Sequence, residues 1–207
     1  MRGKFITLEG CDGCGKSTQI EMLKSTLLQK DVQFVFTREP GGTEISERIR
    51  GIISNPDLKE MDSVTELLLY AAARRQHTVE FISRNLAQGK LVFCDRYSDS
   101  TVAYQGYGRG LDLKLIDFCN EIALGDEKID LTIFFDLSPE EAFLRKGGAD
   151  KNDRLECEEM DFYNRIYNGY RSIALKNPSR VAIVDAHGTP EEVHQRMLLE
   201  LSKRGIL

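Results

Sequence analysis

Several features that mark large classes of proteins are missing from this 207-residue chain. No apolar run approaches the ~18 residues that a membrane-spanning helix requires. The net charge is -5 and there is no basic tail, which argues against duplex nucleic acid as the main partner, because such binding needs a basic surface. The three histidines, His77, His187 and His194, stand in no Ser-His-Asp or Cys-His motif. Each is therefore predicted to lie at the surface or at a helix end.

An export signal, an internal repeat and a linker are also missing. Residues Met1–Lys4 lead directly into an apolar segment rather than into a signal peptide. The five cysteines are an odd number, and without an export signal we expect reduced thiols in the cytoplasm. The composition, 41% hydrophobic and 29% charged, is typical of a globular protein. We predict one soluble, cytoplasmic domain over residues 1–207, with no membrane or nucleic-acid partner.

What the sequence does contain is a phosphate-binding loop in its proper context. The apolar run Phe5–Leu8 predicts a strand, and the segment Gly10–Ser17 that follows it fits G-x-x-x-x-G-K-[ST]. A helical pattern with Ile20, Leu23 and Leu27 on one face begins immediately afterwards. Glycines let the backbone turn tightly, so that successive N–H groups and the helix N-terminus point at the phosphates.

The side chains of this loop suit a nucleoside triphosphate and its metal ion. Lys16 brings a full positive charge to the β- and γ-phosphates, and the Ser17 hydroxyl is suited to ligate Mg²⁺. Asp95 directly follows the apolar run Leu91–Cys94 and is predicted to be the Mg²⁺ carboxylate. The residues predicted to bind ATP are Gly10, Cys11, Asp12, Gly13, Cys14, Gly15, Lys16, Ser17 and Thr18.

Predicted strands and helices alternate along the whole chain. After the first strand, strands are predicted over Val32–Thr37, Leu91–Cys94, Leu131–Leu137 and Val181–Val184. Helices are predicted over Lys16–Gln29, Thr43–Ile53, Ser63–Leu86, Leu115–Leu124, from Pro139, over Leu155–Leu175 and over Pro190–Lys203. This order predicts an α/β protein with the P-loop NTPase fold, a five-stranded parallel sheet flanked by helices. Its ligands would lie beyond the carboxyl ends of the strands.

Cationic side chains gather near these strand ends and in one segment with two glycines. Arg38, Arg48, Arg74 and Arg96 are suited to clamp a second phosphate. The segment of about residues 145–154 is predicted to be a short mobile lid that closes over the transferred phosphoryl group and excludes water. The predicted catalytic cations are Lys16, Arg96, Arg145, Lys151 and Arg154. An acceptor that is already a phosphate needs no general base, so alignment and charge neutralisation suffice.

Three motifs together resemble the thymidylate kinase family, of the bacterial kind, over essentially the whole chain. They are Gly10–Thr18, Thr37–Thr43 (Thr-Arg-Glu-Pro-Gly-Gly-Thr) and Asp95–Gly106 (Asp-Arg-Tyr-Ser-Asp-Ser-Thr-Val-Ala-Tyr-Gln-Gly). The last two separate thymidylate kinases from adenylate, guanylate and cytidylate kinases. The resemblance implies transfer of the γ-phosphate of ATP to dTMP, giving dTDP and ADP for dTTP synthesis, and a homodimer.

The resemblance also implies a role for each acceptor-site residue. Tyr70 would stack on thymine, and Arg74, Thr101 and Gln105 would hydrogen-bond the base. Asp12 would read the sugar 3′-hydroxyl, with Tyr104 beside the edge that lacks a 2′-hydroxyl. Arg38 and Arg96 would bind the acceptor phosphate, and Glu39 and Arg48 are assigned to the same site. Because Gly13 stands where one subtype has an arginine, the chain resembles the subtype with catalytic cations in the lid, here Arg145, Lys146, Lys151 and Arg154.

The sequence leaves two alternative functions open, and it leaves two interpretations of the cysteines in the phosphate loop open. The alternative functions are another small-acceptor P-loop kinase, such as a nucleoside kinase, and a nucleotide-gated regulatory module, although no guanine-reading N-K-x-D occurs. Cys11 and Cys14 form a C-x-x-C inside the loop. We interpret them as tolerated small residues rather than as a redox switch, because a disulfide would strain a loop that must stay wide around phosphate.

Overall fold

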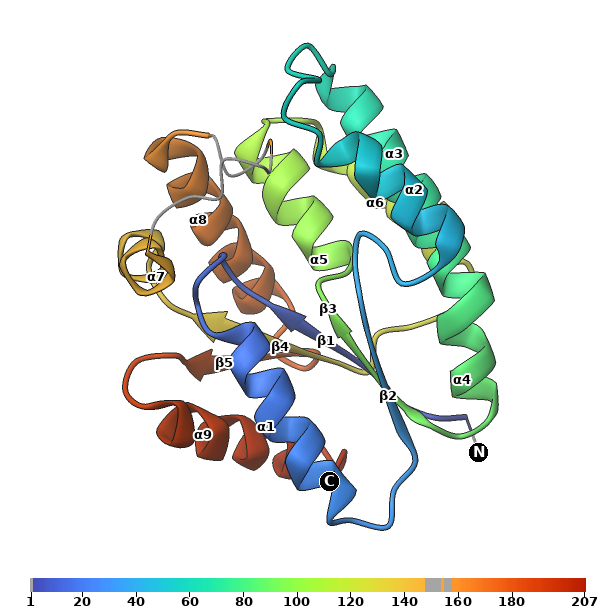
Figure 1. Cartoon of the computed structure of the whole chain (residues 1–207), viewed down its shortest axis with the longest axis vertical. Coiled ribbons are helices and arrows are strands. Elements are labelled where there is room, and N and C mark those ends of the chain that lie inside the picture. The colour runs from blue at the N-terminus through green and yellow to red at the C-terminus, as the bar shows by residue number, and fades with distance from the viewer. Residues whose placement is uncertain (1, 148–153, 155–157) are drawn as a thin grey trace.

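A parallel β-sheet forms the centre of the molecule (Figure 1). The computed structural model describes residues 2–147, 154 and 158–207. The strands are β1 (Phe5–Glu9), β2 (Phe34–Arg38), β3 (Leu91–Asp95), β4 (Leu131–Asp136) and β5 (Val181–Asp185). They pair in the order β2-β3-β1-β4-β5, and every pair is parallel. The predicted α/β class, with its five-stranded parallel sheet, is confirmed.

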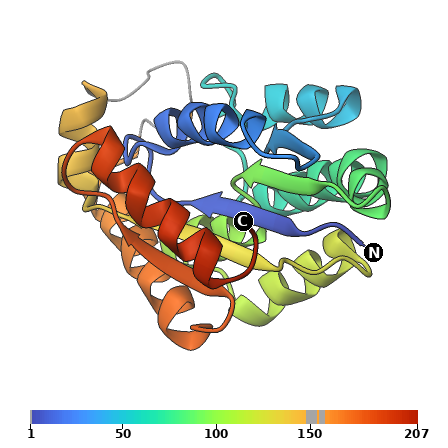
Figure 2. The ribbon, with the colours of Figure 1, turned by 90° about the horizontal axis from the view of Figure 1, so that it is seen from below.

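Helices cover both faces of this sheet (Figure 2). In chain order they are α1 (Lys16–Leu28), α2 (Glu44–Ile53), α3 (Ser63–His77), η1 (Thr78–Ile82), α4 (Ser83–Ala87), α5 (Ser98–Thr101), η2 (Val102–Gly108), α6 (Leu113–Leu124), α7 (Pro139–Lys146), α8 (Met160–Lys176) and α9 (Pro190–Lys203). Helices α1 and α9 contact each other, and α8 packs against η2 and β5. Because helices lie on both faces, β1 is buried along its whole length, which explains why it reads as an unbroken apolar run.

Side-chain caps are present where the chain enters α2 and α9. The Thr43 hydroxyl accepts a hydrogen bond from the backbone N–H of Ser46. Thr189 and Glu192 form a capping box, in which each side chain accepts from the other residue's backbone N–H. These local hydrogen bonds satisfy helix N–H groups that have no partner within the helix, so the starts of these two helices were predictable.

The long helix predicted to begin at Ser63 continues to Ala87 but is not α-helical throughout. It runs as α3, a wider π-helical turn η1, and α4. Gly89 follows the end of α4 with φ = 81°, a conformation typical of a glycine just beyond a helix. The π turn contains Thr78, whose hydroxyl lies 2.6 Å from the buried Tyr97 hydroxyl.

One helical segment, α5 with η2, was not predicted, because its polar residues and glycines have low helix propensity. Tertiary packing overrides that propensity. A Cβ on Gly108 would lie 2.7 Å from the Phe162 ring on α8, and a Cβ on Gly169 of α8 would lie 2.9 Å from Tyr107. The glycines therefore allow the backbones of η2 and α8 to approach closely.

Two further boundaries differ from the sequence prediction. Helix α6 begins at Leu113, two residues earlier than predicted, because the Asp112 side chain caps it. Helix α8 begins at Met160, after an extended Glu159, and the preceding Glu158 pairs with Arg109 at 2.5 Å; the predicted start at Leu155 lies outside the described residues. Residues 148–153, which form most of the predicted lid, lie outside the described residues.

Within the described part of the chain, none of the helices combines the length and apolar character needed to traverse a membrane.

Candidate active site

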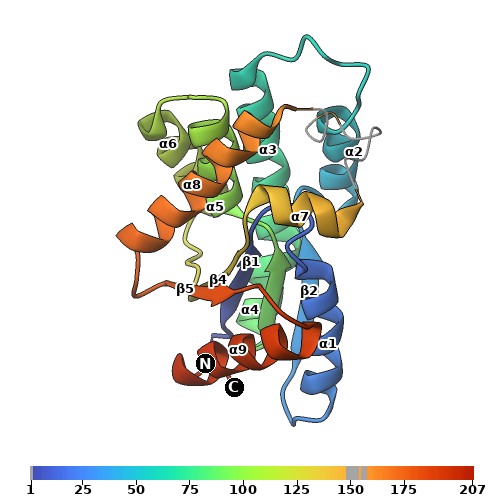
Figure 3. The same ribbon diagram turned by 90° about the vertical axis from the view of Figure 1, so that its left-hand side faces the viewer.

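The phosphate loop leaves β1 at the carboxyl edge of the sheet and lies against α7 (Figure 3). Two of its glycines are required by their surroundings as well as by their backbone angles. A Cβ on Gly10 (φ 145°) would lie 2.9 Å from the Phe135 carbonyl oxygen, and one on Gly13 (φ 88°) would lie 2.1 Å from that of Ala142. Helix α1 starts without a side-chain cap, so its first N–H groups remain available to an anion.

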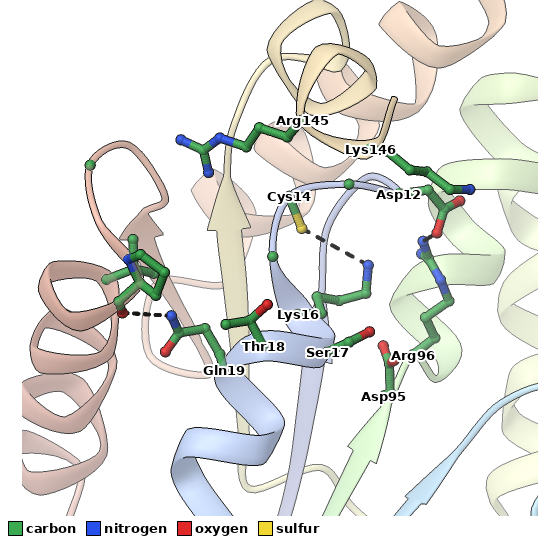
Figure 4. A pocket seen from close by; sticks show the side chains of 15 residues that line it. Asp12, Cys14, Lys16, Ser17, Thr18, Gln19, Asp95, Arg96, Arg145 and Lys146 are labelled. Carbon is green, nitrogen blue, oxygen red and sulfur yellow. Dashed lines mark hydrogen bonds and ion pairs between the residues drawn. The ribbon is translucent and has the colours of Figure 1, made fainter. Parts of the chain in front are cut away.

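The first pocket lies over this loop and the start of α1 (Figure 4). Its volume is about 500 Å³, within the range of small-molecule sites. The lining residues are Asp12, Gly13, Cys14, Gly15, Lys16, Ser17, Thr18, Gln19, Asp95, Arg96, Arg145, Lys146, Gly188, Pro190 and Val193. Seven of the nine residues predicted to bind ATP are in this set, whereas Gly10 and Cys11 lie beneath it in the loop.

Lys16 folds back over the loop from the first turn of α1. Its Nζ donates hydrogen bonds to the carbonyl oxygens of Gly10 at 3.0 Å and Cys11 at 3.3 Å. The side chain is only 6% exposed, yet it lines the pocket. A buried ammonium group at the floor of a pocket is suited to bind an anionic ligand.

Asp95 is the described residue best placed to hold a cation near Ser17. It ends β3, beside the phosphate loop, and both side chains line the first pocket. The Asp95 Oδ1 atom is buried and has no hydrogen-bond partner among the described residues. An orphaned carboxylate oxygen next to a hydroxyl is a fitting pair of ligands for Mg²⁺, which prefers oxygen.

Asp12 and Arg96 form an ion pair at the entrance of this pocket, as Figure 4 shows. Arg96 Nη2 lies 2.7 Å from Asp12 Oδ1, while Nη1 donates to the hydroxyls of Ser100 and Tyr170. Although burial opposes it, the positive charges of Arg96 and Lys16 hold the pKa of Asp12 well below its usual range. Asp12 is therefore ionised at neutral pH.

The Arg96 backbone is strained. Its φ of 65° lies in the left-handed region, which costs a non-glycine residue on the order of 1–3 kcal/mol. The Arg96 N–H is fixed by a 3.0 Å hydrogen bond to the Leu8 carbonyl oxygen. The strain turns the chain sharply after β3, so that Asp95 and Arg96 both face the same site.

Beneath this ion pair lies the buried carboxyl group of Glu9, the last residue of β1. Glu9 accepts from the Tyr97 backbone N–H at 2.7 Å and from the hydroxyls of Ser100 at 2.6 Å and Tyr170 at 3.1 Å. Burial and, secondly, the negative charge of Asp99 raise the pKa of Glu9 to about 7. The same two hydroxyls contact Arg96, so Glu9 supports the floor of the site.

A second pocket opens next to the first. It is lined by Asp12, Arg38, Glu39, Pro40, Arg50, Ser54, Tyr70, Arg74, Asp95, Arg96, Tyr97, Ser100, Thr101, Tyr104 and Gln105. Nine of the ten residues predicted to bind the acceptor are brought together here. Asp12, Asp95 and Arg96 line both pockets, so the two pockets meet at these side chains.

Arg48 is the predicted acceptor residue that the structure does not bring to this pocket. It lies on the outer face of α2, 78% exposed, and pairs with Glu44 one turn earlier at 2.7 Å. Arg50 lines the pocket instead and donates to the Pro40 carbonyl oxygen at 3.0 Å. Residues two apart on a helix face in different directions, so the structure brings Arg50 rather than Arg48 to this pocket.

Arg74 is almost fully buried, and its position is fixed by three partners. Its Nε donates to Glu39 at 2.7 Å, and its Nη1 donates to Thr101 and to Asn120, each at 2.8 Å. A buried guanidinium is tolerated only when it is paired in this way. Asn120 was missed in the sequence, where nothing in its α6 surroundings signals a contact with α3.

His77 is fully buried and is the last residue of α3, so of the predicted surface or helix-end position only the helix end holds. Its ring nitrogens lie 2.9 Å from Glu39 and 2.7 Å from the Thr37 hydroxyl. It thus holds the carboxylate that in turn holds Arg74. His194 is also buried, between α9 and α1, and contacts Gln19 and Thr26; only His187 is exposed, as expected. The sequence signal for His77 was its place on the inward face of α3.

The lid cations occupy separate places. Arg145 lines the first pocket and donates to the Ala186 carbonyl oxygen at 2.8 Å. Figure 4 shows it on the opposite side of the pocket from Arg96. Lys151 lies outside the described residues. Arg154 is buried against α2 and α3, where it donates to the Ile53 carbonyl oxygen and to Glu66, so the structure does not bring it to the first pocket.

Cys11 and Cys14 are both buried and free. Burial raises the pKa of the Cys11 thiol to about 12 and also raises that of Cys14. Protonated, buried thiols react slowly. Among the described residues, there is also no group of three or more His, Cys, Asp or Glu side chains that could hold a metal ion. The geometry therefore favours small structural residues over a redox or zinc site.

A phosphate-binding loop on a parallel sheet, with two joined polar pockets, defines a P-loop enzyme that acts on nucleotides. Residues 8–197 match the family model "Thymidylate kinase". The thymidylate kinase of Syntrophotalea carbinolica is 44% identical over 204 residues, which is 96% of this chain and 94% of the relative. That of Exiguobacterium sibiricum is 43% identical over 208 residues, covering 99% and 98%. A crystal structure of thymidylate kinase from Ehrlichia chaffeensis matches with a TM-score of 0.80 at 35% identity, covering 97% of this chain and all of that one.

The chain belongs to the thymidylate kinase family and phosphorylates dTMP to dTDP. The predicted family, fold and enzymatic function are thereby confirmed, and the alternatives of a nucleoside kinase or a non-catalytic module are set aside. As a member of this family it uses ATP with Mg²⁺.

Proposed function

We propose that the first pocket binds ATP with Mg²⁺, that the second binds dTMP, and that the γ-phosphate passes between them. The observation that carries this proposal is the shared wall of Asp12, Asp95 and Arg96. A donor and an acceptor phosphate that meet there lie next to a fixed guanidinium. Because the acceptor phosphate is already ionised, alignment and charge neutralisation are sufficient for transfer.

On the donor side, Lys16 neutralises the β- and γ-phosphates and gives up its hydrogen bonds to the loop carbonyl oxygens. Ser17 and Asp95 would hold Mg²⁺, which when bound neutralises charge on the phosphates. The buried Oδ1 of Asp95 supports this assignment, since it has no partner among the described residues. The remaining loop residues surround the phosphates with backbone N–H groups.

On the acceptor side, Tyr70 stacks on thymine, while Arg74, Thr101 and Gln105 hydrogen-bond the base. Their common place in the second pocket supports these roles. Asp12 reads the 3′-hydroxyl, and the Tyr104 hydroxyl, 3.3 Å from Asp12, stands at the neighbouring sugar edge. Arg96 and Arg38 bind the acceptor phosphate. Arg38 is held for this by its Nη2, which lies 2.9 and 3.0 Å from the two carboxylate oxygens of Glu47.

Release of ADP, measured with dTMP, dUMP, dCMP and UMP as acceptors, tests this assignment. We expect dTMP to be best and dUMP modestly weaker, because one methyl group in an apolar slot is worth only ~1 kcal/mol. We expect dCMP to fail by orders of magnitude in kcat/KM, since its amine faces the donor group of Arg74. If dCMP matched dTMP, the roles of Arg74, Thr101 and Gln105 would be wrong.

We further propose the subtype whose catalytic cations come from the lid rather than from the phosphate loop. Gly13 supports it, because a side chain at this position would collide with the Ala142 carbonyl oxygen, so an arginine has no room there. Arg145 and Lys146 of the lid segment line the donor pocket. We retain Lys151 as a third lid cation for the transferred group.

A homodimer is proposed through helices α2, α3 and α6. Each presents exposed apolar side chains, spaced by three, four or seven residues along one face: Ile45 and Ile52 on α2, Val64 and Leu68 on α3, and Leu115, Phe118 and Ile122 on α6. Helix α3 contacts both α2 and α6, and a surface of this kind is typical of an interface. Sedimentation of the wild type and of Phe118→Glu tests it: a wild-type monomer would refute the dimer.

We also propose a cytoplasmic location. The free thiols among the described residues, Cys11, Cys14, Cys94 and Cys119, support it, because reduced cysteines persist in a reducing compartment. Fractionation of cells that produce the protein tests it, and recovery mainly outside the cytoplasmic fraction would refute it.

A further inference from the structure

We infer that Glu66 is a positioning residue for selection of the acceptor base: it fixes the Gln105 amide with its NH₂ group turned away, so that its carbonyl oxygen is presented to the base. This inference rests on the proposed function, because it takes the second pocket as the dTMP site. Glu66 itself does not line that pocket, and no motif in the sequence distinguishes it.

The contact between Glu66 and Gln105 is direct and buried. Gln105 Nε2 lies 2.7 Å from Glu66 Oε1, and each side chain is only 1% exposed. An ionised carboxylate accepts hydrogen bonds and cannot donate them. The amide of Gln105 must therefore present its NH₂ group to Glu66, and its carbonyl oxygen must point elsewhere.

The surroundings keep Glu66 ionised. Arg109 lies 3.3 Å from Glu66 Oε2, and the Arg154 guanidinium donates to the same oxygen. Burial acts to raise the pKa of Glu66, but the Gln105 hydrogen bond and the arginines outweigh it and lower the pKa below its ordinary value. With two cations beside it, the carboxylate is ionised, and therefore an acceptor, at neutral pH.

This orientation completes a pattern of hydrogen-bonding groups in the pocket. The Thr101 hydroxyl oxygen accepts from Arg74 at 2.8 Å, which leaves the hydroxyl proton to be donated to a ligand. Arg74 and Thr101 thus supply donors, and the fixed Gln105 carbonyl supplies an acceptor. Thymine presents the complement, an N3–H between two carbonyl oxygens, whereas cytosine presents an unprotonated N3 that would face the Gln105 carbonyl.

A purely structural role for Glu66 makes a different prediction. Glu66 links α3 to η2 through Gln105 and Arg109, so its loss would also loosen packing. Arg109→Lys disturbs the same network, including the 2.5 Å pair with Glu158, but leaves the Glu66 carboxylate opposite Gln105. It is therefore the matched control, since it separates loosened packing from a lost amide orientation.

The test compares wild type, Glu66→Gln and Arg109→Lys with dTMP and dCMP as acceptors at saturating ATP. In Glu66→Gln the new amide offers either end to Gln105, so the orientation is no longer enforced. We expect KM for dTMP to rise about tenfold, kcat to change less than about threefold, and the preference for dTMP over dCMP to fall about tenfold or more. Arg109→Lys should keep the wild-type preference even where its melting temperature falls.

A rescue variant sharpens the result. In Glu66→Gln/Gln105→Glu the carboxylate stands at position 105 and offers only acceptors to the base, while the amide introduced at position 66 donates to that carboxylate. We expect this double variant to recover most of the preference for dTMP over dCMP. A preference unchanged in Glu66→Gln, or a lost preference that the double variant does not restore, would overturn the inference.

A ligand-based measurement does not depend on how well the variants fold. The monophosphate of 3-deazathymidine carries C–H in place of N3–H and, as a 4-hydroxy-2-pyridone, a hydroxyl in place of the O4 carbonyl, and we expect the wild-type enzyme to bind it at least tenfold more weakly than dTMP. Equal affinity would overturn the inference. A wild-type enzyme that does not prefer dTMP at all would instead refute the proposed acceptor site, and this inference with it.

Discussion

The buried carboxyl group of Glu9 makes the stability of this protein depend on pH near neutrality. Glu9→Gln is the informative perturbation, because it keeps the shape of the side chain and removes its charge. The oxygen of the introduced amide can accept from the Tyr97 N–H, and its NH₂ group can donate to the Ser100 and Tyr170 hydroxyls that now donate to Glu9. The variant therefore preserves the contacts and isolates the titration.

The size of the effect follows from the pKa of Glu9, which is about 7 in the folded protein against an ordinary value of 4.5. Between pH 4.5 and pH 7 the folded state holds a proton on Glu9 that the unfolded state has lost. The contribution of Glu9 to stability is therefore fully present below pH 4.5 and is lost as the pH rises through 7. The full loss is about 3 kcal/mol, of which about 2.5 kcal/mol falls between pH 5 and pH 8. Burial and the negative charge of Asp99 raise this pKa, whereas Arg96 opposes the rise.

Urea denaturation of wild type and Glu9→Gln at pH 5, 6, 7 and 8 measures this contribution. The free energy of unfolding of Glu9→Gln minus that of wild type should rise with pH by about 2–3 kcal/mol over this range. Glu21→Gln, which removes a carboxylate that is 71% exposed, controls for the loss of one negative charge. A difference for Glu9→Gln that stays constant or falls with pH would refute the reasoning.

Three further predictions concern the phosphate loop. Lys16→Met should abolish phosphoryl transfer while the melting temperature stays within a few degrees of wild type, since Lys16 serves as a point charge rather than as core; near-normal turnover would contradict this. Cys11 and Cys14 should resist alkylation and mild oxidation in the folded protein, and a reversible loss of activity on oxidation would speak for a disulfide. Gly13→Ala should destabilise the protein by about 2 kcal/mol or more, because its Cβ would lie 2.1 Å from the Ala142 carbonyl oxygen, and chemical denaturation measures it.

Where a structural feature depends on neighbouring residues in the chain, the sequence was a good guide to it. The phosphate loop, the strands and the caps at Thr43 and Thr189 all follow from residues within a few positions of one another. These features are local: apolar runs form the strands, glycines permit the turn, and hydroxyls cap the helices. Arg38, Asp95 and Arg96 also follow, because the carboxyl ends of parallel strands converge at one edge of the sheet. Tyr70, Tyr104 and Gln105 were expected only from the family resemblance.

The network beneath the acceptor pocket was not predictable, because its contacts join distant parts of the chain. Glu39 and Arg74 are 35 residues apart, and Glu9 and Tyr170 are 161 apart. No periodicity in the sequence reports such a pair. His77 illustrates the difficulty: the sequence indicates that it lies on an inward helix face, but only the fold places it against the Glu39 carboxylate.

The wall that Asp12, Asp95 and Arg96 give to both pockets has a thermodynamic consequence. Two ligands that share charged neighbours do not bind independently, so occupancy of one pocket must change the affinity of the other by a factor that works equally in both directions. A single molecule with a triphosphate-like end and a nucleotide-like end would find its second pocket at an effective concentration in the millimolar range once the first end is bound. The span between the two ends, rather than the affinity of either, would then decide how tightly such a molecule holds.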